Sequence, residues 1–478
     1  MLVGNIGSCS AAFFAALCSM AVTAATSPQR AHVGFEQCAL PEVERAARCG
    51  TVTVPEDWQA LNGRTIAIGI AVVPARNPVP KKDPIVILMG GPGESAIEDA
   101  SIYARWLAPV LDDRDLVLVD QRGAGSSAPL RCPIENGNDP APLLADAFPP
   151  GAIKTCTAEL ARTADLTKYG FLPFARDLEQ IRTRLGYGRL NLFAGSYGTR
   201  AAQVFLRAYP KSVRTAYLGS VVPIDIVAPL TMAKTAQVEI ERLFDDCAAD
   251  PQCRQSYPQL RSEFSAVMRQ LDQGKAKVTL GDGRREIVLR TAPAAAWFRA
   301  KLYRPSSAAI LPWAIHRAYQ GDWSAVSEGV LAASGSSLSY GLFFAITCNE
   351  DMRFIDRDRI ETETRDTFLG ASRVRQQQAG CRFWPSSSLP DRYREPVRSS
   401  VPTLFVTGEA DGGTPTWFTD HAAQTFTNAA ILLAPGQGHT EWSTCIAARY
   451  FSLVRQGRLT GPRRASCPVV RRPPFKTE

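Results

Sequence analysis

Leu190-Asn-Leu-Phe-Ala-Gly-Ser196-Tyr-Gly-Thr-Arg200 joins a short apolar run to a helical pattern, with a serine at the junction. The run from Leu190 to Phe193 predicts a buried strand that stops at small residues. Apolar residues spaced for one helical face follow between Tyr197 and Tyr209. Ser196 is therefore predicted to lie on a sharp turn between a strand and a helix.

A turn of this kind suits a nucleophilic serine. It lifts the Ser196 side chain above the sheet edge and points the N–H groups of the new helix at whatever Ser196 attacks. The segment departs from the common Gly-x-Ser-x-Gly pattern at Ala194, which is still small enough for the turn. The alternative is an ordinary strand-to-helix turn with a capping serine. Because short motifs occur by chance, the rest of the chain has to decide.

The amino terminus is typical of a secretory signal peptide. Residues 1–25 carry no charge, and the apolar run from Ala11 to Val22 is too short to span a bilayer. Small residues up to Ala25 offer cleavage sites, although the usual basic start is missing. We expect a secreted or periplasmic protein with no stable membrane span. A buried amino-terminal helix is the alternative.

The cysteine content supports export. The chain has 12 cysteines, and those outside the expected signal peptide, which holds Cys9 and Cys18, are even in number, as in disulfide-bonded exported proteins. The absence of a Cys-x-x-Cys pair disfavours zinc and thioredoxin-like chemistry. Sequence cannot determine connectivity. Pairing sequential neighbours is the simplest hypothesis, and it predicts Cys38–Cys49, Cys132–Cys156, Cys247–Cys253, Cys348–Cys381 and Cys445–Cys467.

The composition favours a large globular core and disfavours a nucleic-acid partner. Apolar residues make up 45% of the 478 residues, and the formal net charge of +8 is mild for this length. Basic residues near the carboxyl terminus, such as Arg471 and Arg472, lie among prolines and predict a solvated tail. The sequence leaves the oligomeric state open.

Strand and helix patterns alternate through the first half of the chain. Buried strands at 84–89 and 115–120 end in glycine-rich loops, and an amphipathic helix at 174–185 precedes the Ser196 strand. This order predicts an α/β fold with a mostly parallel sheet and helices on both faces. Such sheets bind ligands at the carboxyl ends of their strands.

The pattern changes at about Ile226. Helical patterns dominate from there, and a buried strand pattern resumes only at 401–407. We therefore expect an inserted helical lid domain at 226–394. It would separate two parts of the core, 26–225 and 395–478, of which the second ends in the tail.

A serine nucleophile needs a histidine base, and the chain has four histidines. In enzymes whose nucleophilic serine lies on such a strand-to-helix turn, the order along the chain is serine, acid, histidine, which excludes His32. His316 lies in a helical lid pattern, and His421 lies on a helix and could face solvent. His439 follows the strand at 430–433 in a glycine-rich loop, so it is the predicted base.

The acid that orients the imidazole should follow the preceding strand. Glu409 and Asp411 are both placed there. Asp411 begins a tight loop, Asp411-Gly-Gly-Thr-Pro415, which can hold a carboxylate against His439. Glu409 would instead form a salt bridge at the strand end. We predict that Asp411 is the acid.

An oxyanion hole needs two backbone N–H groups. Tyr197, directly after the nucleophile, is predicted to supply one. The other should come from the loop Gly90-Gly-Pro-Gly93, where Gly91 is the candidate because glycine allows close backbone approach. The alternative for this loop is a plain turn. No metal or organic cofactor is implied.

Six segments together carry a resemblance to a known family. They are Gly90–Gly93, Asp120–Ser126, Arg176–Arg182, Gly195–Thr199, Gly408–Asp411 and Gly436–His439. With them the chain resembles the prolyl aminopeptidase and tripeptidyl aminopeptidase family of α/β-hydrolase serine exopeptidases, and the secreted, cysteine-rich branch fits better than the cytosolic one. Met89, where family members often carry histidine, and Ala194 depart from the family pattern.

The resemblance implies that the lid supplies carboxylates for the free amino terminus of the substrate. An ammonium group that leaves water needs a paired anion. The segment Ile346–Asp351 resembles the corresponding lid segment of the family, which makes Glu350 the candidate and Asp351 the second. The alternative is that these carboxylates are solvated or paired with Arg353.

The leading hypothesis is a secreted serine aminopeptidase that releases one or a few residues from peptides with a free amino terminus. An esterase or lipase-like hydrolase on the same triad is the nearest rival, because this fold hosts many hydrolases. A non-catalytic binding protein on a hydrolase scaffold is a third possibility, which the complete set of serine, aspartate and histidine disfavours.

Overall fold

The computed structural model describes residues 34–477, except for 133–138, 140, 281–284 and 334–337. The expected signal peptide at 1–25, with Cys9 and Cys18, and His32 lie outside the described residues. Val33–Glu478 forms one compact unit, to which everything below refers.

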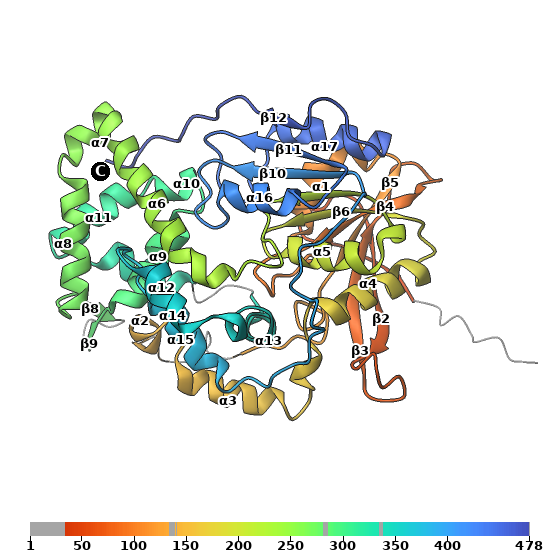
Figure 1. Cartoon of the computed structure of the whole chain (residues 1–478), viewed down its shortest axis with the longest axis horizontal. Helices are drawn as coiled ribbons and strands as arrows, with labels where there is room; N and C mark the ends of the chain where they lie inside the picture. Colours follow the sequence, from red (N-terminus) through yellow and green to blue (C-terminus); the bar gives the residue numbers. More distant parts are fainter. Residues whose placement is uncertain (1–33, 133–138, 140, 281–284, 334–337, 478) are drawn as a thin grey trace, which may run out of the picture. The chain divides into compact units, whose positions relative to one another are not determined.

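Ten strands of the described residues form one sheet, in the order β1-β2-β3-β5-β4-β6-β7-β10-β11-β12 (Figure 1). Neighbours are parallel from β5 to β12, and β1, β2 and β3 form an antiparallel edge. The expected mostly parallel sheet is confirmed. The strands are β1 (Glu36–Cys38), β2 (Ala47–Pro55), β3 (Thr65–Val73), β4 (Lys81–Leu88), β5 (Arg114–Val119), β6 (Leu190–Gly195), β7 (Val213–Gly219), β10 (Thr403–Gly408), β11 (Ala429–Ala434) and β12 (Arg464–Ser466).

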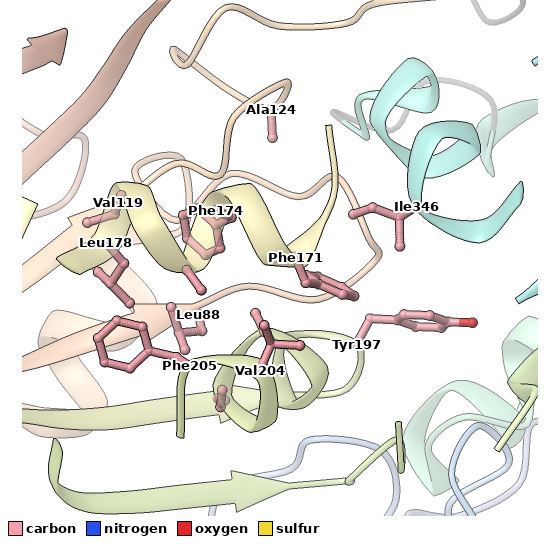
Figure 2. Packing of buried hydrophobic residues seen from close by; sticks show 14 of the residues in the cluster. Leu88, Val119, Ala124, Phe171, Phe174, Leu178, Tyr197, Val204, Phe205 and Ile346 are labelled. Carbon is pink, nitrogen blue, oxygen red and sulfur yellow. The ribbon is translucent and has the colours of Figure 1, made fainter. Parts of the chain in front are cut away.

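Side chains of the central strands alternate between two apolar layers. On β4, Ile85 and Ile87 pack with α1 and α17, whereas Val86 and Leu88 pack with α4 and α5. Figure 2 shows Leu178 of α4 and Phe205 of α5 close to Leu88. Helices therefore cover both faces, as a buried parallel sheet requires. They are α1 (Ala100–Leu107), α4 (Phe171–Arg184), α5 (Gly198–Ala208), α16 (Thr416–Ala423) and α17 (Thr444–Gln456).

Strands β7 and β10 lie side by side, with Ala216 opposite Thr403, so residues 220–402 form an insertion between neighbouring strands. Among its described residues, the hairpin of β8 (Lys277–Leu280) and β9 (Arg285–Val288) supplies the strands, and the other regular elements are helices. Its helices are α6 (Ala228–Ala249), α7 (Pro251–Ser256), α8 (Leu260–Asp272), α9 (Thr291–Lys301), α10 (Pro305–Ala308), α11 (Leu311–Tyr319), α12 (Ser324–Ala333), α13 (Tyr340–Glu350), α14 (Arg357–Thr364) and α15 (Ser372–Cys381).

Two segments outside the predicted lid pack against the inserted helices. One holds α2 (Ala141–Ala145) and α3 (Pro150–Leu160), and Phe148 between them stacks on Phe343 of α13. The other is the carboxyl-terminal tail, where Lys476 N donates to Ala309 O at 3.0 Å. The expectation of a solvated tail is wrong for these last residues, because Phe475 is buried in the apolar core of the insertion.

Helix α13 is buried on all sides. Every residue from Gly341 to Glu350 is buried, as expected of a helix that is apolar all round. Figure 2 shows Ile346 of α13 on the side toward which Phe171 of α4 and Tyr197 extend. The core of the sheet therefore continues into this part of the insertion.

Five disulfides join the ten described cysteines, and the pairs are those that sequential pairing predicts. The bridge between Cys348 and Cys381 ties α13 to α15 within the insertion. Among the described residues, no helix combines the length and the apolar character needed to cross a bilayer. Disulfides at this density suggest a protein that works outside the cytoplasm.

Candidate active site

Ser196 lies at the predicted turn between β6 and α5. Its φ of 53° is in the left-handed region, which non-glycine residues rarely adopt and which is typical of a strained nucleophile. The turn is held by a hydrogen bond from Ser196 N to Gly219 O of 3.1 Å. Gly198 must be glycine, since a Cβ there would lie 2.1 Å from Leu88 O. Ala194 is accommodated because it lies still within β6.

His439 and Asp411 meet at the carboxyl end of the sheet. Nδ1 of His439 lies 2.9 Å from Oδ1 and 3.0 Å from Oδ2 of Asp411, and both residues are buried. Burial alone would raise the pKa of Asp411, but the neighbouring His439, together with hydrogen bonds from His439 and Thr414, holds it below its usual value. Asp411 therefore stays ionised and can orient the imidazole.

Two residues beside Asp411 were not among the predicted site residues. Ser220, at a φ of 51° directly after β7, donates Oγ–H to Asp411 Oδ2 at 2.8 Å and accepts from Thr440 N at 2.9 Å. Thr414 donates both its N–H and its Oγ–H to Asp411, at 2.8 and 2.7 Å. The available signal was that Ser220 directly follows β7, which neighbours the Ser196 strand, and that Thr414 lies in the loop after β10.

The insertion holds the loop of His439. Tyr303 O accepts from His439 N at 2.7 Å, and Arg304 Nε donates to His439 O at 2.9 Å. The ring of Tyr303 lies 4.9 Å from the imidazole, centroid to centroid. Residues between α9 and α10 thus fix the predicted base.

The predicted oxyanion-hole residues lie in the same cavity wall as Ser196 and His439. Gly91 has a φ of 98°, and a Cβ there would lie 2.7 Å from Leu338 Cδ1, so glycine is required. Tyr197 precedes the first turn of α5, where N–H groups are free to bind an anion. The structure therefore brings together Ser196, His439, Gly91 and Tyr197.

The cavity has a volume of about 390 Å³ and carries charges of both signs. Its acidic residues, Glu94 and Asp99, come from the loop after β4. Its basic residues, Arg299, Arg304 and Arg373, come from the insertion. A substrate in this cavity therefore meets carboxylates from the core and guanidinium groups from the inserted helices.

The profile of the alpha/beta hydrolase fold family matches residues 83–440, which is most of the chain. The chain belongs to this family. The match begins in β4 and ends directly after His439, so it includes every residue of the predicted triad.

Curated relatives of this chain include peptidases and an esterase. Serine protease Hip1 of Mycobacterium tuberculosis is 31% identical over 229 residues, 44% of this chain and 44% of that protein. Tripeptidyl aminopeptidase of Streptomyces coelicolor is 26% identical over 428 residues, 83% of this chain and 78% of that protein. Carboxylesterase B of Mycobacterium tuberculosis is 30% identical over 224 residues, 43% of this chain and 42% of that protein. The matches to Hip1 and carboxylesterase B span less than half of either protein.

Glu350 and Asp351 are not among the residues that line the cavity, so their predicted contact with substrate needs correction. Glu350 is buried at the end of α13, where it accepts from Phe171 N at 3.0 Å and from Tyr393 Oη. Asp351 is paired with Arg200, at 2.8 and 2.9 Å, rather than with Arg353. Helix α13 is buried up to its last residue, Glu350. Both carboxylates therefore join the insertion to the core, Glu350 through Phe171 and Asp351 through Arg200.

The other described histidines lie outside the cavity. His421 Nε2 lies 2.6 Å from Asp225 Oδ2, and His316 Nδ1 lies 3.0 Å from Glu263 Oε2. Glu409, the competing acid, accepts from Gly436 N at 3.3 Å and is exposed. Among the described residues, no cluster of three or more His, Cys, Asp or Glu side chains is placed to hold a metal ion.

Proposed function

We propose that this serine hydrolase is an aminopeptidase. Ser196 attacks the peptide carbonyl, His439 takes and returns the proton, and Asp411 orients the imidazole. The N–H groups of Gly91 and Tyr197 stabilise the oxyanion. The tripeptidyl aminopeptidase relative, aligned over most of this chain, supports the peptidase assignment. The five disulfides support a secreted or periplasmic location.

The observation that carries the proposal is the carboxylate of Glu94. Its side chain is accessible within the cavity, and no described residue forms an ion pair with it. A Cβ on Gly90 would lie 3.0 Å from Ser196 Cβ and 3.5 Å from Glu94 Oε2, so this carboxylate lies beside the nucleophile. Limited hydration, and then the charge of Asp99, raise the pKa of Glu94. The positive charge of a substrate ammonium group would stabilise the ionised Glu94 carboxylate and so offset both effects.

The place of Glu94 also favours a small number of released residues. The amino nitrogen of a terminal residue is two bonds from its own carbonyl carbon, so a carboxylate next to Ser196 suits the removal of one residue. An unpaired carboxylate here also opposes the negative charge that develops on the oxyanion. Substrates that bring an ammonium group neutralise it, whereas N-blocked substrates do not.

The test compares alanine 4-nitroanilide, its N-acetyl form and a neutral ester, in the wild type and in Glu94→Gln. We expect Glu94→Gln to lower kcat/KM for the free amine by about tenfold or more, since it strands one charge of a desolvated pair. The same variant should hydrolyse the neutral ester at least as fast as the wild type. Glu98→Gln, which changes an exposed carboxylate of the same loop outside the cavity, is the matched control.

The outcomes separate the candidate functions. Equal cleavage of free and acetylated amides by the wild type would contradict an aminopeptidase. Hydrolysis of esters alone would favour an esterase, the activity named in the carboxylesterase B relative. A preference for free amines that survives Glu94→Gln would move the ammonium site to Asp99, the other cavity carboxylate. Failure of a fluorophosphonate probe to label Ser196 would favour a non-catalytic scaffold.

A further inference from the structure

The inserted helices place an uncompensated positive cluster in the cavity wall. Arg373 and Gln377 lie one turn apart on α15 and so share a face of that helix. Arg299 comes from α9. All three residues line the cavity that holds Ser196.

Polar groups in this cluster lack partners. Nε of Arg373 and Nε of Arg299 are shielded from water and have no hydrogen-bond partner in the part of the chain that the structure describes. Gln377 is fully buried, and neither its amide nitrogen nor its amide oxygen is hydrogen-bonded there. Buried polar groups are nearly always paired in native proteins. Unpaired polar atoms on three side chains around one cavity therefore point to a ligand that is not part of the chain.

The positive charges are held in place without being neutralised. The guanidinium group of Arg373 lies 4.4 Å from the ring centroid of Phe148 and 5.7 Å from that of Phe343. Arg299 donates to Tyr303 Oη at 2.6 Å, but no described carboxylate pairs with either arginine. Burial, and then the charge of Arg299, lower the pKa of Arg373 to about 10, so it remains cationic at neutral pH. Two desolvated like charges favour an anion between them.

We propose that Arg373, with Arg299 and Gln377, binds a carboxylate group of the substrate. A guanidinium group matches the two oxygens of a carboxylate, and the Gln377 amide can add a third donor. The inference rests on the proposed Ser196 hydrolase site but not on its peptidase specificity. The carboxylate has two possible sources in a peptide: an acidic side chain near the amino terminus, or the carboxyl terminus of a very short peptide.

The decisive experiment uses two esters with the same carbon chain length, mono-4-nitrophenyl glutarate, which ends in a carboxylate, and 4-nitrophenyl valerate, which ends in a methyl group. We expect the wild type to prefer the acidic ester in kcat/KM, and Arg373→Gln to lower this preference about tenfold or more. Arg373→Lys should retain part of it. Arg375→Gln is the matched control, because Arg375 lies on the same helix but is exposed and outside this cavity. Equal losses for both esters in Arg373→Gln would indicate a structural role and overturn the proposal.

A binding measurement makes the test independent of turnover. Glutarate should raise the Tm of the wild-type protein and of Arg375→Gln, whereas the neutral glutaramide should not. Arg373→Gln should lose the glutarate response while keeping its own Tm near that of the control variant. If glutarate and glutaramide act alike on the wild type, the carboxylate site does not exist.

Two peptide comparisons then identify the source of the carboxylate. Glu 4-nitroanilide against Gln 4-nitroanilide tests an acidic side chain on the released residue, and a free tripeptide against its carboxyl-terminal amide tests the terminus. We expect Arg373 to matter in one pair. If neither pair depends on Arg373 although the acidic ester does, the anion site stands but its ligand is not a peptide carboxylate, which overturns the two sources given above. If no pair of any kind depends on Arg373, the anion site fails while the peptidase assignment is untouched.

Discussion

At the scale of single residues, the acid of the site is defined by its hydrogen bonds. Asp411 accepts from Gly413 N at 2.8 Å, from Ser220 Oγ at 2.8 Å and from Thr414, in addition to His439. Each donor stabilises the ionised carboxylate and removes freedom from it. An imidazole held this way keeps one tautomer, with Nδ1 toward Asp411 and Nε2 free to serve Ser196.

Replacing the nucleophile tests this arrangement. Ser196→Ala should lower kcat by about a million-fold, as the loss of a triad nucleophile does, and His439→Ala should be comparably inactive. His421→Ala should retain nearly normal activity, because His421 pairs with Asp225 away from the cavity. Steady-state kinetics on any cleaved ester or amide measure all three. A Ser196→Ala variant with a tenth of wild-type activity would rule out Ser196 as the nucleophile.

At the scale of elements, α13 explains why a carboxylate can lie near the site without serving it. The helix is buried on all sides, so Glu350 at its end is enclosed between α4 and Tyr393. Burial raises the pKa of Glu350 to about 7, against the hydrogen bonds from Tyr393 and Phe171 and the charge of Arg200. The protonation of Glu350 is therefore linked to folding.

This linkage gives a pH dependence with a definite sign. The folded pKa of about 7 lies above the ordinary value of 4.5, so folding takes up a proton between these values. The free energy of unfolding should therefore contain a contribution that is present below about pH 4.5, declines as the pH rises and is lost above about pH 7. Urea unfolding of wild type and Glu350→Gln at pH 5 and pH 8 should show the variant gaining stability relative to wild type at the higher pH.

The same variant tests whether Glu350 contacts the amino terminus of the substrate. Glu350→Gln should leave unchanged the ratio of kcat/KM for the free substrate to kcat/KM for the N-acetylated substrate. Glu94→Gln should lower this ratio. A selective loss of activity on free amines in Glu350→Gln would restore Glu350 as the ammonium partner. Tyr393→Phe, which removes only the hydrogen bond to Glu350, would then help to separate packing from binding.

At the scale of the whole molecule, the insertion completes the site. Tyr303 and Arg304 hold the backbone of His439, and α9 and α15 supply the basic side of the cavity. The core supplies the nucleophile, the acid and the carboxylates Glu94 and Asp99. Substrate selection thus depends on how firmly the inserted helices are joined to one another and to the core.

Disulfides provide one of these joints. Non-reducing peptide mapping of the mature protein should find the five bridges of the structure. Removing the Cys348–Cys381 bridge by a double serine substitution should cost about 2–4 kcal/mol of unfolding free energy, because the bridge restricts the unfolded chain. Removing Cys247–Cys253, which spans 6 residues rather than 33, should cost less and is the control. Free thiols in protein from an oxidising compartment would contradict the bridge count.

The sequence by itself determined the features that depend on local pattern and chain order. Apolar runs and turn residues predicted the central strands, the Ser196 turn and the loops that carry Asp411 and His439. The carboxyl ends of parallel strands must meet at one edge, so residues at those ends could be assigned to one site. Pairing sequential cysteines also predicted the observed bridges, which close short loops.

Only the tertiary structure decided which polar side chains face the cavity. Glu94 follows the glycine-rich loop after β4, whereas Glu350 ends the apolar helix α13, and neither stretch of sequence says which of the two carboxylates reaches the cavity. Burial of α13 enclosed Glu350, whereas the turn after β4 left Glu94 open beside Ser196. The meeting of Arg299 with Arg373 likewise joins helices far apart in sequence. Orientation toward a cavity is set by packing between distant elements, which local sequence patterns do not encode.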